Sequence, residues 1–142
     1  MRYLLLVSHG TFAPGLHSVL KMLLGEREDV LSTSLEDGMG ADTYIENLKA
    51  TLEPVGADDE LVVLADILGG SPLTNALNVI AEKGLLGSTI AFAGMNLPMA
   101  ITAAMGLQTS DLTELKANLM SEGKDGVKEF VIEAPADDED EI

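Results

Sequence analysis

The 142 residues suffice for one domain with a substantial hydrophobic core, and the absence of cysteine excludes thiol chemistry and cysteine-based zinc sites. The chain has 8 basic and 24 acidic residues and a formal net charge of −16 at pH 7, so nucleic acids and anionic membrane surfaces should be repelled. A basic protein partner is the more natural expectation, although acidity also serves to keep a protein soluble.

The apolar content indicates neither export nor a membrane span. Only five apolar residues, Tyr3 to Val7, follow Arg2, and this is short for the apolar region of a secretory signal. The stretch from Gly84 to Ser110 has no charge and is long enough to cross a bilayer, but glycines and Pro98 interrupt it. We therefore expect a cytoplasmic protein in which this stretch forms a buried strand, a loop and a buried helix.

The first half of the chain predicts two strand and helix pairs. Tyr3 to Val7 is a short apolar run typical of a strand buried on both faces, and it stops at Ser8-His9-Gly10. Helical spacing follows until Gly25, and Val30 to Leu35 alternates like a strand near a sheet edge. Asp42 is predicted to cap a second helix that ends before Pro54. The expected buried residues of the two helices are Leu16, Val19, Leu20, Leu23, Leu24, Tyr44, Ile45, Leu48 and Leu52.

The second half continues the alternation. Leu61 to Ala65 predicts a third buried strand, and Ser71-Pro72 predicts a helix start with Ser71 as its cap. Ser88 to Ala93 predicts a fourth strand, followed by a helix that ends near Gly106. Ser110 is expected to cap one more helix, which fades at Gly123.

The remaining residues predict an edge strand and a tail. Val127 to Ile132 is a short apolar run that should either join the sheet edge antiparallel or pair elsewhere. The acidic run within residues 133–142 cannot bury anything and is expected to be disordered. The sequence thus predicts one doubly wound α/β domain over residues 1–132 with a mostly parallel sheet.

Two of the buried strands end in residues that can carry chemistry. His9 follows the first strand and Asp66 the third, and sequential strands of such sheets are usually neighbours. A carboxylate on one ring nitrogen fixes the tautomer and leaves the other nitrogen as a nucleophile or base. The turn Gly69-Gly70-Ser71 offers amides and a hydroxyl for a phosphoryl group, and Gly10 allows close approach of a ligand.

Blander interpretations apply to each of these residues taken alone. A lone histidine is more often structural, and Ser71 before Pro72 can be nothing more than a helix cap. His17 falls beside the apolar stripe of the first predicted helix, where a structural or solvent-facing role is expected. Ser8 has no base near it in the sequence and no GxSxG elbow, which disfavours acyl transfer.

Three separated motifs carry a resemblance to a known family. LLVSHG at residues 5–10, DILGGSP at 66–72 and GMNLPM at 94–99 resemble the signatures of the mannose-family (mannose/fructose/sorbose) IIA component of the bacterial phosphoenolpyruvate-dependent sugar phosphotransferase system. The similarity extends over about residues 1 to 132 and implies that His9 accepts a phosphoryl group from the carrier HPr and passes it to a histidine of the IIB component. Asp66 matches the family aspartate that pairs with that histidine, and Ser71 the serine beside the phosphoryl group.

The resemblance also implies a sheet ordered 2-1-3-4 and a homodimer that exchanges its fifth strands. The membrane components IIC and IID would be reached only indirectly, and from the acidic end we expect a free-standing IIA subunit without an attached IIB domain. Two alternatives stay open: the phosphohistidine domain of a dihydroxyacetone kinase phosphotransferase, and a regulatory sensor phosphorylated at His9. A histidine phosphatase or mutase would require arginine in place of Ser8. No metal or cofactor is required, because transfer between histidines needs positioning and electrostatics.

Overall fold

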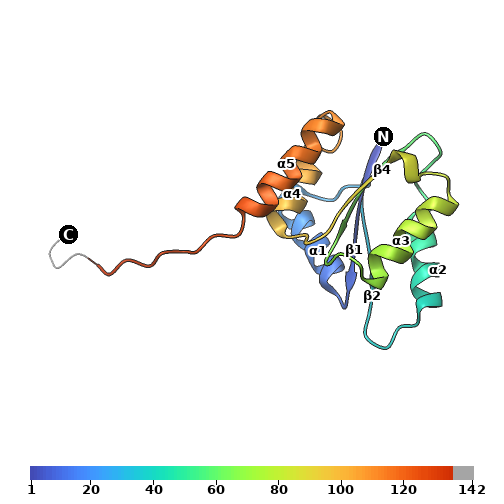
Figure 1. The fold of residues 1–142 in the computed structure, drawn as a ribbon, viewed down its shortest axis with the longest axis horizontal. Coiled ribbons are helices and arrows are strands. Elements are labelled where there is room, and N and C mark those ends of the chain that lie inside the picture. Colours follow the sequence, from blue (N-terminus) through green and yellow to red (C-terminus); the bar gives the residue numbers. More distant parts are fainter. Residues whose placement is uncertain (136–142) are drawn as a thin grey trace.

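Four parallel strands form the centre of the computed structural model, which describes residues 1–135 (Figure 1). The strands are β1 (Arg2–His9), β2 (Val30–Leu35), β3 (Glu60–Ala65) and β4 (Thr89–Phe92). The helices are α1 (Phe12–Leu24), α2 (Ala41–Thr51), α3 (Ser71–Glu82), α4 (Leu97–Gly106) and α5 (Leu112–Asp125), with a short 3-10 helix at Leu86–Ser88. The sheet order is β2-β1-β3-β4, which confirms the predicted order 2-1-3-4.

The position of β1 determines where a site can form. It pairs in parallel with β2 on one side and with β3 on the other. The connection after β1 thus leads to one side of the sheet and the connections to β3 and β4 lead to the other, so the strand order reverses between β1 and β3. Ligands of open α/β sheets bind at this switch point, beyond the carboxyl ends of the strands.

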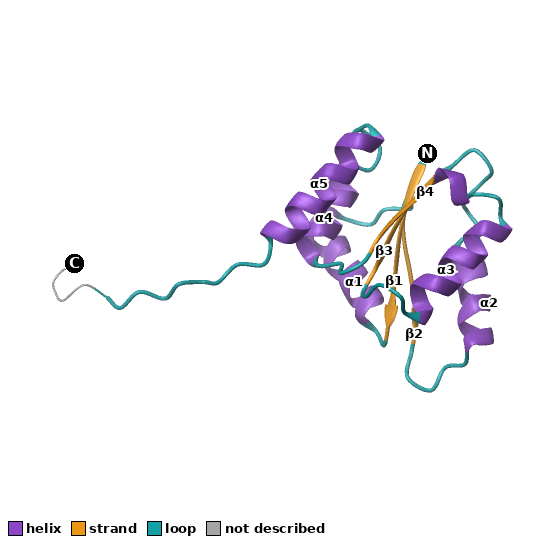
Figure 2. Ribbon diagram, in the orientation of Figure 1, coloured by secondary structure: helices purple, strands orange, loops and turns teal. Residues whose placement is uncertain are grey.

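Helices cover both faces of the sheet, as Figure 2 shows. Leu4 and Leu6 of β1 pack among residues of α1, α4 and α5, whereas Leu5 and Val7 pack among residues of α2 and α3. Successive strand side chains point to opposite faces, so a strand covered on both faces reads as one continuous apolar run. The buried stripe of α1 is narrower than predicted, because Leu23 is 55% exposed.

Two helices begin differently from the prediction. α2 has Gly40 at its N-cap, so Asp42 lies within the first turn instead of capping it. α5 is capped by Asp111, not Ser110, and the Asp111 side chain accepts from the amide of Glu114. The cap falls on the residue whose backbone is extended just before the helix, and sequence patterns place that residue only to within one or two positions.

The predicted fifth strand is not present in this chain's sheet. Residues 127–135 form no strand in the part of the chain that the structure describes, and they extend away from α5 (Figure 1). Val127, Phe130 and Ile132 are 79%, 87% and 86% exposed. An apolar run pairs as a strand only where a sheet edge is within reach, and this one meets none in its own chain. The acidic run at 137–141 lies outside the described residues.

The uncharged stretch of residues 84–110 contains a strand and a helix, β4 and α4, as predicted. The strand is only partly buried, contrary to the prediction, because β4 lies at the edge of the sheet, and a short 3-10 helix that was not predicted precedes it. Within residues 1–135, no helix has both the length and the apolarity that crossing a membrane requires.

Candidate functional site

His9 and Asp66 meet at the carboxyl edge of β1 and β3, as the sequence predicts. His9 is the last residue of β1, and Asp66 directly follows β3. One carboxylate oxygen, Asp66 Oδ2, lies 2.8 Å from His9 Nδ1 and also accepts from the His9 backbone amide at 3.0 Å. Two donors from one residue therefore hold both the orientation and the tautomer of the ring.

Asp66 is ionised in this arrangement. Its side chain is mostly buried, and burial alone would raise its pKa. The hydrogen bonds from the His9 backbone, the His9 ring and the amide of Ile67 outweigh burial and lower the pKa of Asp66 below its ordinary value. Because a carboxylate only accepts hydrogen bonds, Nδ1 carries the proton, and Nε2 is the ring nitrogen that Asp66 leaves free.

The turn between β3 and α3 lies against the ring of His9. A Cβ added at Gly70 would approach His9 Cε1 to 2.9 Å, so only glycine leaves room for the imidazole. Gly69 has φ of +81°, a left-handed conformation that allows the turn to reverse direction. The site predicted around Gly70 thus places the backbone of α3's first turn beside His9.

Ser71 does not cap α3, contrary to the prediction. The N-cap is Gly70, and Ser71 is the first residue of the helix and makes no side-chain cap bond. The reason is conformational: Gly70 has φ −87° and ψ 160°, the extended geometry of an N-cap, whereas Ser71 already belongs to the helix. The exposed Ser71 hydroxyl is therefore not used to satisfy the amides of its own helix.

Gly10 continues β1 into the loop that precedes α1. Its φ is +59°, and its amide donates to the carbonyl of Leu35 at 2.8 Å. That amide is therefore already engaged. Together with His9, Leu35 at the end of β2 and residues 36–39 that follow it, Gly10 lines an open depression of about 370 Å³. The loop after β2 shares the His9 end of the sheet, as expected.

Ser8 has a role that the sequence analysis missed. Its side chain is fully buried, and its hydroxyl accepts from the amide of Ala13 in the first turn of α1 at 2.7 Å. The residue at N-cap of that helix, Thr11, makes no side-chain cap bond. A serine shortly before a helical pattern could have indicated this role. Ser8, however, lies five residues before Ala13, whereas the side chain of an N-cap residue binds an amide only two or three residues later.

Three exposed apolar residues lie on the chain segments next to His9 and Asp66. Phe12 begins α1, and Ile67 and Leu68 lie in the turn between β3 and α3; each is exposed, Leu68 to 82%. The His9 side chain is itself 46% exposed.

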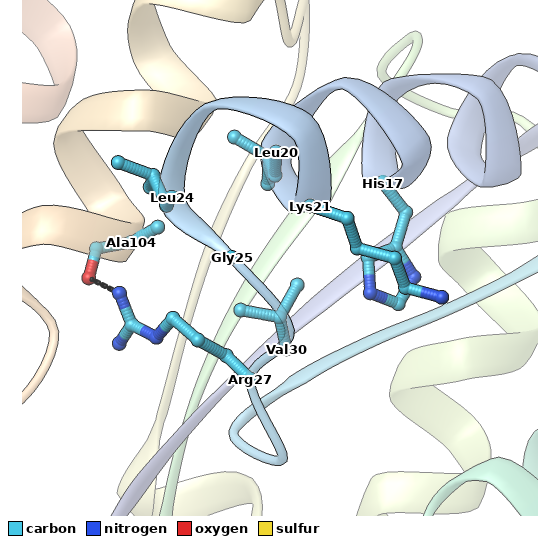
Figure 3. A pocket seen from close by; sticks show the side chains of 8 residues that line it. All are labelled: His17, Leu20, Lys21, Leu24, Gly25, Arg27, Val30 and Ala104. Carbon is cyan, nitrogen blue, oxygen red and sulfur yellow. Dashed lines mark hydrogen bonds between the residues drawn. The ribbon is translucent and has the colours of Figure 1, made fainter.

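His17 lies outside this site, at a small pocket of about 10 Å³ (Figure 3). Its Nδ1 lies 2.7 Å from the hydroxyl of Ser32, and its Nε2 is buried without a partner in the described structure. Burial, and then the charge of Lys21, lower the pKa of His17. Arg27 closes the far side by donating to the carbonyl of Ala104. This arrangement supports the structural interpretation of His17.

Within residues 1–135, no three potential metal ligands of the His, Cys, Asp or Glu type gather together.

Residues 3–120 match the family EIIA-man, described as the PTS system fructose IIA component. The chain belongs to this family. The mannose-specific EIIAB component of the PTS from Escherichia coli (strain K12) is 32% identical over 122 residues, which are 85% of this chain and 37% of that protein. The fructose-specific EIIA component from Bacillus subtilis (strain 168) is 29% identical over 111 residues, which are 78% of this chain and 74% of that protein.

The fold of the EIIA-man family agrees with solved structures. The mannose/sorbose-specific IIA subunit from Enterococcus faecalis superimposes with a TM-score of 0.77 at 29% identity, covering 94% of this chain and 97% of that one. Membership in the EIIA-man family supports a phosphotransfer role in sugar uptake. The chain spans about a third of the length of the E. coli relative, so that protein's combined activities are not carried over as a whole.

Proposed function

We propose that this protein is a phosphoryl relay that accepts the group from phosphorylated HPr on His9 and passes it to a histidine of a IIB component. The observation that carries the proposal is the His9–Asp66 pair at the switch point of the sheet. In this proposal the chain works in the cytoplasm and serves the membrane components IIC and IID without contacting them. Residues 1–132 form the functional unit.

The chemistry follows from the tautomer. Nε2 of His9 attacks the phosphorus of the donor phosphohistidine, and a new N–P bond forms as the donor's N–P bond breaks. The donor imidazole leaves with the electron pair of that bond. The proton on Nδ1 stays in the hydrogen bond to Asp66, whose charge balances the phosphorylated ring. Transfer to IIB repeats the same exchange with His9 as the donor.

The phosphoryl oxygens are proposed to lie over the first turn of α3. Free amides at the start of a helix, together with the helix dipole, favour an anion. Gly70 brings this turn against the ring, and the hydroxyl of Ser71, which accepts a long bond from Asn75 Nδ2 at 3.5 Å, adds a donor. Gly10, with its φ of +59°, turns the chain after His9 and lines the open depression beside that residue.

Docking is proposed to combine apolar contact with charge. Phe12, Ile67 and Leu68 supply exposed apolar surface next to His9. The net charge of −16 suits a carrier with a basic face and speeds encounter with it.

We propose a homodimer in which residues 127–132 complete the sheet of the partner. Two features support this: the exposed apolar side chains of that segment, and β4, which pairs on one side with β3 and has no second partner within residues 1–135. Truncation after Gly123 should yield monomer or aggregate in light scattering, whereas truncation after Ala136 should change little. A full-length protein that is monomeric at micromolar concentration would overturn the dimer.

The relay is tested by incubation with phosphoenolpyruvate, enzyme I and HPr. The protein should take up one acid-labile, base-stable phosphoryl group per chain, and His9→Ala should take up none. The matched control is His17→Ala, which changes the other histidine of the chain and should label normally. Full labelling of His9→Ala would refute the proposal. Onward transfer to the cognate IIB separates a relay from a sensor that only holds the group.

A further inference from the structure

Tyr44 is a buried polar side chain that the mechanism above does not use. It lies on α2, its side chain is 0% exposed, and its hydroxyl donates to the carbonyl of Pro72 at 2.8 Å. Pro72 belongs to the first turn of α3, which packs beside α2 (Figure 1). A single side chain on one helix therefore reaches the start of the next helix, where that helix faces His9.

This phenol stays a hydrogen-bond donor at every physiological pH. Burial raises the pKa of Tyr44 well above its ordinary value, and the negative charge of Asp66 raises it further.

The first turn of α3 lacks the usual local support. Its N-cap is a glycine, no side chain caps it, and no acidic residue lies within it. Pro72 and Leu73 anchor the turn by burial, and its hydrogen bonds are the bond from the amide of Thr74 to the carbonyl of Gly70 and the bond from Tyr44. Of these two hydrogen bonds, only the bond from Tyr44 comes from another element.

The position of this turn matters for the ring of His9. The added Cβ at Gly70 that would approach His9 Cε1 to 2.9 Å shows how little space separates the turn from the imidazole. A displacement of the turn toward or away from the ring would change both the support of His9 and the place of the amides.

We propose that Tyr44 is a positioning residue for phosphoryl transfer, acting through Pro72 to hold the first turn of α3 against His9. The proposal rests on the proposed relay function and adds to it a residue that touches neither the phosphoryl group nor the ring.

The chain contains its own matched control. Its only other tyrosine, Tyr3, is also buried, packs in the same core cluster and donates to a proline carbonyl, that of Pro54, at 3.3 Å. Tyr3 is the second residue of β1, whereas His9 is the last residue of that strand, so the two lie at opposite ends of it. Phenylalanine in either position removes one phenol-to-carbonyl bond and keeps the shape of the core.

The test compares Tyr44→Phe with Tyr3→Phe in single-turnover transfer from phosphorylated HPr, below the unfolding midpoint of the less stable variant. We expect Tyr44→Phe to slow transfer about 10-fold. A reacting group misplaced by 1 Å can lose roughly 10²-fold in rate, and the loss of one hydrogen bond should shift the turn by less than that. Tyr3→Phe should stay within about twofold of the wild type. Affinity for HPr, measured separately, should be the same in all three proteins, because no docking surface has changed.

A second measurement needs no transfer. The ring nitrogen signals of His9 in nitrogen NMR should shift in Tyr44→Phe and not in Tyr3→Phe. Equal transfer rates in the two variants, or unshifted His9 signals in Tyr44→Phe, would overturn the proposal and leave both phenols as structural. Failure of the wild type itself to accept a phosphoryl group would instead reject the relay, and the role of Tyr44 in transfer with it.

Discussion

A single methyl group added at Gly70 tests the geometry of the site most directly. Gly70 has φ −87° and ψ 160°, so alanine fits its backbone without strain. The new Cβ would lie 2.9 Å from His9 Cε1, about 0.5 Å inside the range where ordinary contacts begin, and 3.4 Å from Ile67 Cγ1. Gly70→Ala thus presses on the imidazole and on little else.

The ring must give way, because the opposing atom is fixed in the backbone of α3's first turn. Moving the imidazole by about 0.5 Å strains its 2.8 Å contact with Asp66 and turns Nε2 away from the attacking line. Misplacement by about 1 Å costs about 10²-fold, so we expect transfer from phosphorylated HPr to fall by about 10- to 100-fold. Stability should change by less than about 1 kcal/mol, since glycine and alanine differ by tenths to 1 kcal/mol at an N-cap.

Gly40 provides the control for this experiment. It is the N-cap of α2 with φ −77° and ψ 159°, and an added Cβ meets nothing within 4 Å. Rapid-quench transfer rates and thermal unfolding are compared for Gly70→Ala and Gly40→Ala. A transfer rate of Gly70→Ala within about twofold of wild type would refute the predicted clash between turn and ring. An equal loss of rate in Gly40→Ala would show that the clash is not the cause of the slower transfer.

Asp66→Asn should slow transfer by about 10²-fold or more with the fold kept in circular dichroism, because a neutral amide cannot balance the charged ring; near-normal transfer would make Asp66 a strand terminator only. Asp29→Asn should lower the free energy of unfolding at pH 7 by about 2 kcal/mol, because Arg27 binds both oxygens of this carboxylate. Burial alone would raise the pKa of Asp29, but hydrogen bonds from Arg27 and Gln108 outweigh it and lower the pKa. The stabilisation by this carboxylate is therefore complete above about pH 4 and is lost as the pH falls further. A difference in urea unfolding between wild type and Asp29→Asn that is the same at about pH 7 and about pH 3 would contradict this. Ser8→Ala should lower stability by about 1 kcal/mol by removing an acceptor from the first turn of α1, and an unchanged unfolding midpoint would show that water replaces the hydroxyl.

The strands and the meeting of His9 with Asp66 could be predicted because each depends on local pattern and on a general rule of topology. A continuous apolar run such as Leu61 to Ala65 identifies a strand buried on both faces. The carboxyl ends of parallel strands share one edge of the sheet, so residues 57 positions apart were expected to meet. The order of the four strands came from the family resemblance.

The support of the site could not be predicted, because it comes from contacts between elements distant in the sequence. Tyr44 looks like one more apolar position of a helical stripe, and nothing near it indicates that its hydroxyl reaches Pro72. The hydroxyl of Ser8 likewise caps a helix from inside the preceding strand. Residues 127–132 were predicted as a strand from a short apolar run, but a strand also requires a paired edge, and these residues pair with neither edge of their own sheet.

The double hold of Asp66 Oδ2 on His9 affects the entropy of each encounter. The oxygen accepts from the backbone amide at 3.0 Å and lies 2.8 Å from the ring nitrogen. Immobilising a side chain during binding costs about 0.5–1.5 kcal/mol, which weakens a complex or slows its formation. For His9 this rotational freedom is lost when the chain folds, so an arriving protein meets a ring whose orientation is already set. A brief contact is then enough for productive alignment, which suits a carrier that must release each partner as soon as the group has moved.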